Sequence, residues 1–119
     1  MESGTDRKLP EHFGRMNDPT ASAYVKGACG DELEFYLVVE DEILREVRFF
    51  TANGCDDTKA AGEAAAEMAE GRNVADALGI SPKKVYDTIK GDVPEEGRHC
   101  SILAVITLHK AIADYLLAP

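Results

Sequence analysis

The fold is decided by residues 33–51, LEFYLVVEDEILREVRFFT, in which apolar and polar side chains alternate over two runs. Apolar side chains recur at every second residue from 33 to 40, a pattern typical of a strand with one buried face. Asp41 and Glu42 interrupt the pattern, which resumes over residues 43–51. The stretch therefore predicts two strands joined in a tight antiparallel hairpin. The side chains expected to face inward are Leu33, Phe35, Leu37, Val39, Ile43, Val47 and Phe49.

The segments around this hairpin predict one further strand and four helices. Residues 21–26 form a short strand that ends before Gly27, and residues 58–70, rich in Ala and Glu, form a helix that stops at Gly71. Asp56, Asp57 or Thr58 is expected to cap that helix. Helices over 73–78, 81–89 and 99–117 follow, the second of them capped by Ser81. Strands first and helices afterwards predict an α+β fold, a small three-stranded antiparallel sheet with helices packed on one face.

Hydrophobic spacing predicts which side of the last helix faces the core. At 3.6 residues per turn, one face carries Ile102, Val105, Ile106, Ile112, Ala113 and Leu116. Thr107 lies off this face, and the acidic residues Glu63, Glu67 and Glu70 are expected to form a solvent-exposed face on the earlier helix.

The length of 119 residues predicts a single packed domain over residues 20–119. Residues 1–19 are polar, contain Pro10, Gly14 and Pro19, and are expected to form a mobile N-terminal arm in which His12 is solvated. The sequence begins without an apolar leader, and its longest strictly apolar run is too short to cross a bilayer. We therefore expect a soluble, cytoplasmic protein without a membrane partner.

Acidic side chains outnumber basic ones, with 22 Asp and Glu against 13 Lys and Arg, so the formal net charge is -9. Such a surface repels phosphate backbones, which argues against a nucleic-acid partner. The composition is otherwise that of a globular protein, with 45% hydrophobic and 29% charged residues.

The three cysteines all fall at boundaries between predicted elements, each within three residues of a glycine. Cys29 lies in the turn before the hairpin, Cys55 where a strand gives way to a helix, and Cys100 at the start of the last helix. A single cysteine is most often a small buried hydrophobe. A thiol at a helix N-terminus, in contrast, has a lowered pKa and binds metal or attacks sulfur more readily.

If the three turns meet at one end of the sheet, their side chains form a mixed sulfur, nitrogen and oxygen site. The candidate metal-binding and cofactor-binding residues are Cys29, Asp31, Cys55, His99 and Cys100. No two cysteines have C-x-x-C spacing, so the spacing alone is a moderate metal signal, and a thiol redox protein is the weaker alternative.

Three motifs resemble the NifU/IscU-type iron-sulfur cluster scaffold proteins in order and separation. They are Cys29-Gly30-Asp31, the segment FFTANGC over 49–55, and HCSILA over 99–104 with AIADY over 111–115. The resemblance extends from about residue 18 to the C-terminus. It implies an α+β scaffold, not an enzyme, that builds a labile cluster, most simply 2Fe-2S, from iron and persulfide sulfur. The implied partners are a pyridoxal-phosphate cysteine desulfurase and apo iron-sulfur proteins.

The resemblance also assigns roles to individual residues. Cys29, Cys55 and Cys100 match the assembly cysteines, Asp31 the acidic residue beside them, and His99 the histidine. Cys100 is the first candidate for persulfide acceptance, because it begins a helix, and Cys55 is the second. A hard oxygen ligand holds iron less firmly than a fourth thiolate, so Asp31 is expected to make the cluster labile.

Two features depart from the family pattern. Val93-Pro94-Glu95-Glu96-Gly97 replaces a Leu-Pro-Pro-Val-Lys stretch, which argues against recognition by an Hsp70-type chaperone. Gly97 aligns with the family's lysine and leaves Arg98 as the nearest cation. The alternative function is a zinc-binding sulfur acceptor that relays persulfide without assembling a cluster, because zinc suits the same donors. That branch of the family has an insertion between its second and third cysteines, and none is visible here.

Overall fold

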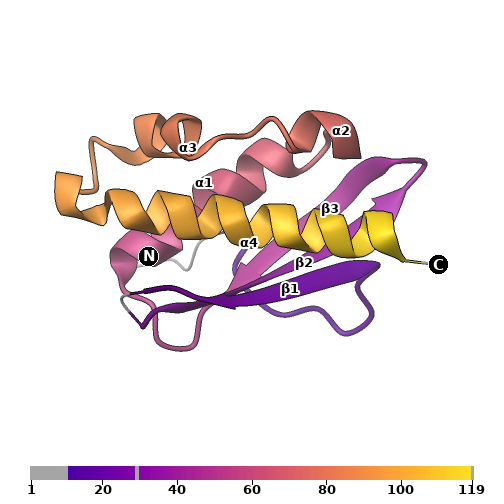
Figure 1. The fold of residues 1–119 in the computed structure, drawn as a ribbon, viewed down its shortest axis with the longest axis horizontal. Coiled ribbons are helices and arrows are strands. Elements are labelled where there is room, and N and C mark those ends of the chain that lie inside the picture. Colours follow the sequence, from indigo (N-terminus) through magenta and orange to yellow (C-terminus); the bar gives the residue numbers. More distant parts are fainter. Residues whose placement is uncertain (1–10, 29, 119) are drawn as a thin grey trace, which may run out of the picture.

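A three-stranded antiparallel sheet carries the helices along one of its faces in this computed structural model, which describes residues 11–28 and 30–118 (Figure 1). The strands are β1 (Ala21–Lys26), β2 (Glu32–Glu40) and β3 (Ile43–Phe50), and β2 lies between the other two. The helices are α1 (Asp56–Ala69), α2 (Val74–Ala77), α3 (Pro82–Ile89), the 3-10 turn η2 (Glu95–Gly97) and α4 (Arg98–Leu117). The predicted α+β class and the helices on one face of the sheet are confirmed.

The hairpin has a two-residue turn and one irregularity. Asp41 and Glu42 have φ angles of 55° and 63°, the left-handed values that a tight hairpin turn of matching twist needs at both central positions. Pairing shifts between Val38 and Val39, which leaves Arg45 as an extra residue in β3. This bulge reverses the alternation, so Leu44 is fully buried and the prediction that Ile43 faces inward is wrong.

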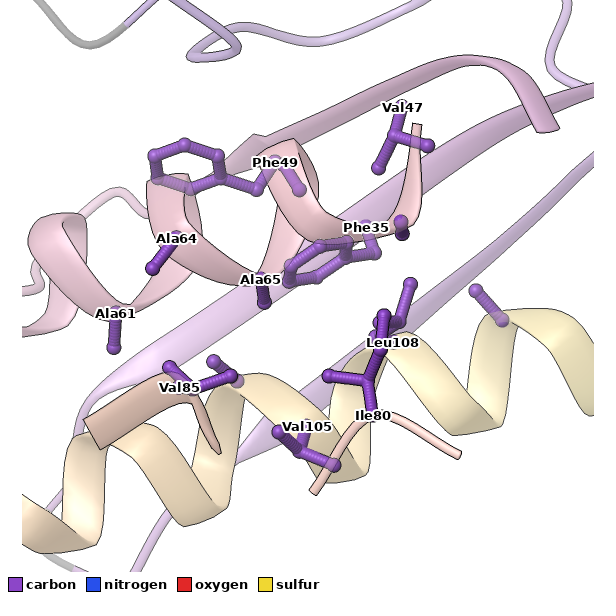
Figure 2. Packing of buried hydrophobic residues seen from close by; sticks show 14 of the residues in the cluster. Phe35, Val47, Phe49, Ala61, Ala64, Ala65, Ile80, Val85, Val105 and Leu108 are labelled. Atoms are coloured by element: carbon purple, nitrogen blue, oxygen red, sulfur yellow. The ribbon is translucent and has the colours of Figure 1, made fainter. Parts of the chain in front are cut away.

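The hydrophobic core lies between the sheet and the helices. Figure 2 shows Phe35 and Phe49 of the sheet beside α1, with Ala65 next to the Phe35 ring, and Val105 and Leu108 of α4 completing the core. Small alanine side chains let α1 approach the aromatic rings closely, and close packing of this kind is what makes a core sensitive to single methyl groups.

Helix α4 is buried on two sides, because it contacts β1 and β2 as well as α1 and α3. Thr107, expected off the buried face, is fully buried and satisfies its hydroxyl by donating to the Leu103 carbonyl at 2.7 Å. Ile102, Ile106 and Leu116, expected in the core, are about half exposed, at 47%, 50% and 52%. A one-face prediction therefore failed for a helix placed between two layers.

The start of α3 agrees with the cap predicted from the sequence, whereas the start of α1 does not. Ser81 caps α3 as predicted, accepting a hydrogen bond from the Lys84 amide, with Pro82 in the first helical position. Helix α1 begins earlier than expected, and its N-cap is Cys55, whose side chain makes no cap hydrogen bond. The helix therefore starts at a thiol that is left free for other partners.

The described part of the N-terminal segment packs against β3. The Gly14 amide donates to the Phe49 carbonyl and the Phe49 amide donates to the His12 carbonyl, so this segment covers the sheet edge. His12 is only 8% exposed, and the prediction that it is solvated is wrong. Packed structure thus begins ahead of residue 20, where we expected the domain to start.

Two residues of the expected solvent face on α1 hold His12. The Nδ1 atom of His12 lies 2.6 Å from Glu63 and its Nε2 atom lies 3.1 Å from Glu70. Burial by itself lowers the pKa of His12, but the hydrogen bonds and charges of the two carboxylates outweigh it, and the pKa is raised above its ordinary 6.5.

The segment Glu95–Leu117 has the length and hydropathy of a membrane-spanning helix, and half of its most apolar window is buried inside the protein. The core helix of a soluble protein meets the same criterion. In this fold the apolar side chains of α4 are accounted for largely by its contacts with the sheet and with α1 and α3.

Replacing Glu63 by Gln is expected to destabilise the protein in a pH-dependent manner. A raised folded-state pKa stabilises the fold fully below the ordinary pKa of 6.5, and this contribution is lost as pH rises through the folded-state value. We expect a loss of about 1 kcal/mol in the free energy of unfolding near pH 6, falling toward zero near pH 9. Urea unfolding at the two pH values measures this loss in the free energy of unfolding. The matched control is Glu67→Gln on the exposed side of the same helix, and an equal loss at both pH values would contradict the argument.

Candidate functional site

Three distant segments of the chain meet at the end of the sheet where α1 and α4 begin (Figure 1). Asp31 comes from the loop between β1 and β2, Cys55 from the start of α1, and Cys100 from the first turn of α4. One carboxylate oxygen and the two sulfur atoms all lie within 4.8 Å of one another. The structure thus brings together three of the five predicted site residues. Cys29 lies outside the described residues.

Asn53 joins the two loops that carry Asp31 and Cys55. Its side-chain oxygen accepts a hydrogen bond from the Glu32 amide at 3.0 Å, and its side-chain nitrogen donates to the Gly30 carbonyl at 3.2 Å. Gly54 permits the tight turn that follows, because a Cβ there would lie 2.4 Å from the Thr51 hydroxyl. These contacts fix the backbone on both sides of the carboxylate and directly before the thiol.

His99 stands at the rim of this cluster with one ring nitrogen turned toward it. The Nε2 atom lies 3.6 Å from the Cys100 sulfur, and the Nδ1 atom lies 2.8 Å from the Glu96 carbonyl oxygen. Since a carbonyl oxygen only accepts, Nδ1 carries a proton in this contact. A neutral His99 therefore presents a lone pair on Nε2, the arrangement in which histidine binds a metal.

Thr58 is the site residue that the sequence alone did not reveal. It is fully buried in the first turn of α1, and its hydroxyl oxygen lies 2.5 Å from Asp31, 3.4 Å from the Cys100 sulfur and 3.6 Å from the Cys55 sulfur. In the sequence it was a candidate helix cap. Its position three residues after Cys55 was the one available signal, because that spacing places both side chains on the same turn.

The two thiols differ sharply in their surroundings. Cys55 is exposed, whereas Cys100 is 1% exposed. Burial raises the pKa of the Cys100 thiol from 9.0 to about 11, and the negative charges of Cys55, Asp31 and Asp57 add to the rise. The lowered pKa expected at this helix N-terminus is not found, because desolvation of the buried thiol disfavours the thiolate.

Gly97, the position where the resemblance expects a lysine, has little room for a side chain. A Cβ at Gly97 would lie 2.5 Å from the Val93 side chain and 2.9 Å from the Asp57 carboxylate. Arg98, the nearest cation in sequence, is exposed, and its guanidinium lies 3.7 Å from the Glu95 carboxylate. The arginine is therefore engaged at the surface next to the cluster of Asp31, Cys55 and Cys100.

Alkylation is expected to separate the two thiols. At about pH 8, a thiol with a pKa of about 11 is ionised in roughly one molecule in a thousand, and Cys100 is also shielded from reagent. We expect iodoacetamide to modify Cys55 at least ~100-fold faster than Cys100 in metal-free protein. Mass spectrometry of the peptides measures both rates. The urea-unfolded protein is the control, in which the two rates should converge, and equal rates in the folded protein would refute the assignment.

Comparison with known proteins places this chain in a family. A family model described as the NifU-like N terminal domain matches residues 6–118. The chain belongs to this family. It is 36% identical over 91% of its length to the iron-sulfur cluster assembly scaffold protein IscU of Aquifex aeolicus, and covers 69% of that protein. It is also 37% identical over 89% of its length to the bifunctional protein NifU/MnmA of Rubrobacter xylanophilus, of which it spans 22%.

The fold of this NifU-like domain is also seen in solved structures. The crystal structure of a nitrogen-fixing NifU-like protein (N-terminal) from Brucella abortus superposes with a TM-score of 0.71 at 16% identity. The alignment covers 92% of this chain and 88% of that one. At this level of identity the likeness concerns the fold, and it agrees with the sheet and helix order described above.

Proposed function

We propose that this NifU-like chain is a scaffold on which an iron-sulfur cluster is assembled and from which it is passed to other proteins. The observation that carries the proposal is the group of donor atoms from Asp31, Cys55 and Cys100 within 4.8 Å of one another, with the Nε2 atom of His99 beside them. Relatives with this domain are named iron-sulfur cluster assembly scaffold proteins. The role is that of a scaffold and not of an enzyme.

The donor set suits a cluster that is held and then released. Thiolates and imidazole bind iron well, whereas a carboxylate is a harder ligand that prefers other metals. Cys55 and His99 are exposed, so a metal bound between them and Cys100 is open to solvent on one side. We assign cluster binding to Cys29, Asp31, Cys55, His99 and Cys100 and favour the 2Fe-2S form.

Sulfur acceptance is proposed at Cys55 before Cys100. In persulfide transfer, the accepting thiolate attacks the terminal sulfur of the donor's persulfide, and the donor's own sulfur leaves as a thiolate. The attacking sulfur must be ionised and reachable, and Cys55 is exposed whereas Cys100 is buried with a pKa of about 11. We therefore favour Cys55 as the first sulfur acceptor, whereas the position of Cys100 at the start of a helix had suggested Cys100.

A cysteine desulfurase as sulfur donor and apo iron-sulfur proteins as acceptors complete the proposal. The free thiols Cys55, which is exposed, and Cys100, which is buried, favour a reducing compartment, the cytoplasm. The alternative of a zinc-binding sulfur acceptor uses the same donors, since two sulfurs, one nitrogen and one oxygen suit tetrahedral Zn(II). The two functions differ in whether a coloured cluster forms.

Anaerobic reconstitution tests the proposed function directly. Protein incubated with ferrous iron, cysteine and a desulfurase is expected to turn brown and to contain iron and sulfide in equal amounts. Cys55→Ser and Cys100→Ser should lose most of the visible absorption, because each removes a thiolate from the donor set. Colourless protein that binds one zinc ion and carries persulfide would instead establish the alternative function.

Replacing Asp31 by Ala is expected to make the cluster more persistent. Without the Asp31 carboxylate, His99 is the remaining non-sulfur ligand for iron, and imidazole suits iron better than a carboxylate does. We expect the half-life of the cluster during transfer to an apo-ferredoxin to lengthen severalfold, measured by the loss of visible absorption. Asp56→Ala, which removes an exposed charge next to Cys55, is the matched control. An unchanged or shorter half-life for Asp31→Ala would show that the carboxylate does not promote release.

A further inference from the structure

Thr58 is a buried polar residue at the centre of the candidate site, and its hydroxyl is shared by three groups. It is 0% exposed, and the nearest polar atoms to its hydroxyl oxygen are the Asp31 carboxylate at 2.5 Å and the Cys100 sulfur at 3.4 Å. The Cys55 sulfur follows at 3.6 Å. A buried hydroxyl needs a partner, and this one lies among the proposed ligands.

The chemistry of these groups fixes the direction of the hydrogen bonds. A hydroxyl has one proton to donate and two lone pairs that accept, whereas a carboxylate only accepts. Thr58 therefore donates its proton to Asp31, and a bond to a charged acceptor at this distance is among the stronger kinds. Toward the thiols it is left as an acceptor, and S–H is a weak donor.

The Asp31 side chain depends on this bond for its orientation. The loop around it is held through its backbone, by the bond from the Gly27 amide to the Asp31 carbonyl and by the Asn53 contacts at Gly30 and Glu32. Among the residues that the structure describes, Thr58 is the group that hydrogen-bonds the carboxylate itself. Asp31 is half-buried at the edge of the site, so without a tether its side chain has solvent to turn to.

We propose that Thr58 is a positioning residue that holds the Asp31 carboxylate among the cluster ligands and thereby sets how readily the cluster is released. This inference rests on the proposed scaffold function. Thr58 acts through Asp31, so its removal should reproduce the effect of removing Asp31. The hydroxyl, and not the bulk of the side chain, carries the effect.

Thr58→Val removes the hydroxyl and keeps the shape of the side chain, whereas Thr58→Ser keeps the hydroxyl. Thr107→Val is the matched control. Thr107 in α4 is also fully buried, and its hydroxyl donates to a backbone carbonyl at 2.7 Å. All variants are compared with the native chain for their free energy of unfolding, so that a general loss of stability is seen separately.

The half-life of the reconstituted cluster during transfer to an apo-ferredoxin is the first measurement. We expect Thr58→Val to lengthen it severalfold, as Asp31→Ala does, and Thr58→Ser and Thr107→Val to leave it near the native value. The double variant Thr58→Val with Asp31→Ala should show no more than the Asp31→Ala effect, because residues acting through one another are not additive.

The second measurement needs no metal. The 13C resonance of the Asp31 side-chain carboxyl in the apo-protein should shift in Thr58→Val and stay in place in Thr58→Ser and Thr107→Val. A native half-life for Thr58→Val, an additive double variant, or an equal effect of Thr107→Val would overturn the inference while leaving the scaffold function intact. A native protein that never turns brown would overturn the scaffold function itself, and with it the part of the inference that concerns release.

Discussion

The burial of α4 between the sheet and the pair α1 and α3 is the contact on which the rest of the structure depends. This helix touches both layers, and it provides much of the core through Leu103, Val105 and Leu108. Apolar area removed from water on two sides is the main source of stability in so small a domain. The same packing fixes the first turn of α4, so Cys100 has little freedom in where its sulfur points.

The site owes its electrostatic character to that burial. Cys100 belongs to the hydrophobic core and to the candidate site at once, which places a sulfur in a poorly hydrated position beside two carboxylates. A bound cation would supply the charge that such a thiolate needs, and its binding would release the proton from the thiol. The wall of the site that Cys55 and His99 form is exposed, and there water has access. One wall is therefore fixed by the core, and the other is open.

Much of the fold could be predicted from the sequence because its signals are local. Alternation gave the hairpin strands, and Ser81 with Pro82 marked the start of α3. The bulge at Arg45 could not be predicted, because it depends on how β3 pairs with β2. The buried face of α4 was missed for a related reason: the spacing of apolar residues assumes one covered face, and this helix has two.

The candidate site was predicted in its outline and not in its energetics. Thiols near glycines at element boundaries pointed to Cys55 and Cys100, Asp31 and His99 were predicted because each lies close in sequence to a thiol, and the family resemblance then assigned roles to them. The pKa of Cys100 depends on desolvation by residues far away in the chain, which no local pattern encodes. Thr58 was missed because a threonine near a helix start is most simply explained as a cap, and here Cys55 holds the cap position instead.

The hairpin turn at the opposite end of the molecule from the candidate site is held in place by two helices. Asp41 and Glu42 both adopt left-handed angles, which disfavours non-glycine residues by about 1 kcal/mol each. Glu42 offsets this by accepting hydrogen bonds from the Val74 amide and from the Tyr115 hydroxyl, so the turn is fastened to α2 and to the last turn of α4. Local opening is favoured where such fastenings are few. The rim that carries Asp31 and Cys55 is fastened as well, through the Asn53 bonds between its two loops and the Thr58 bond from α1 to Asp31, so both ends of the sheet resist local opening.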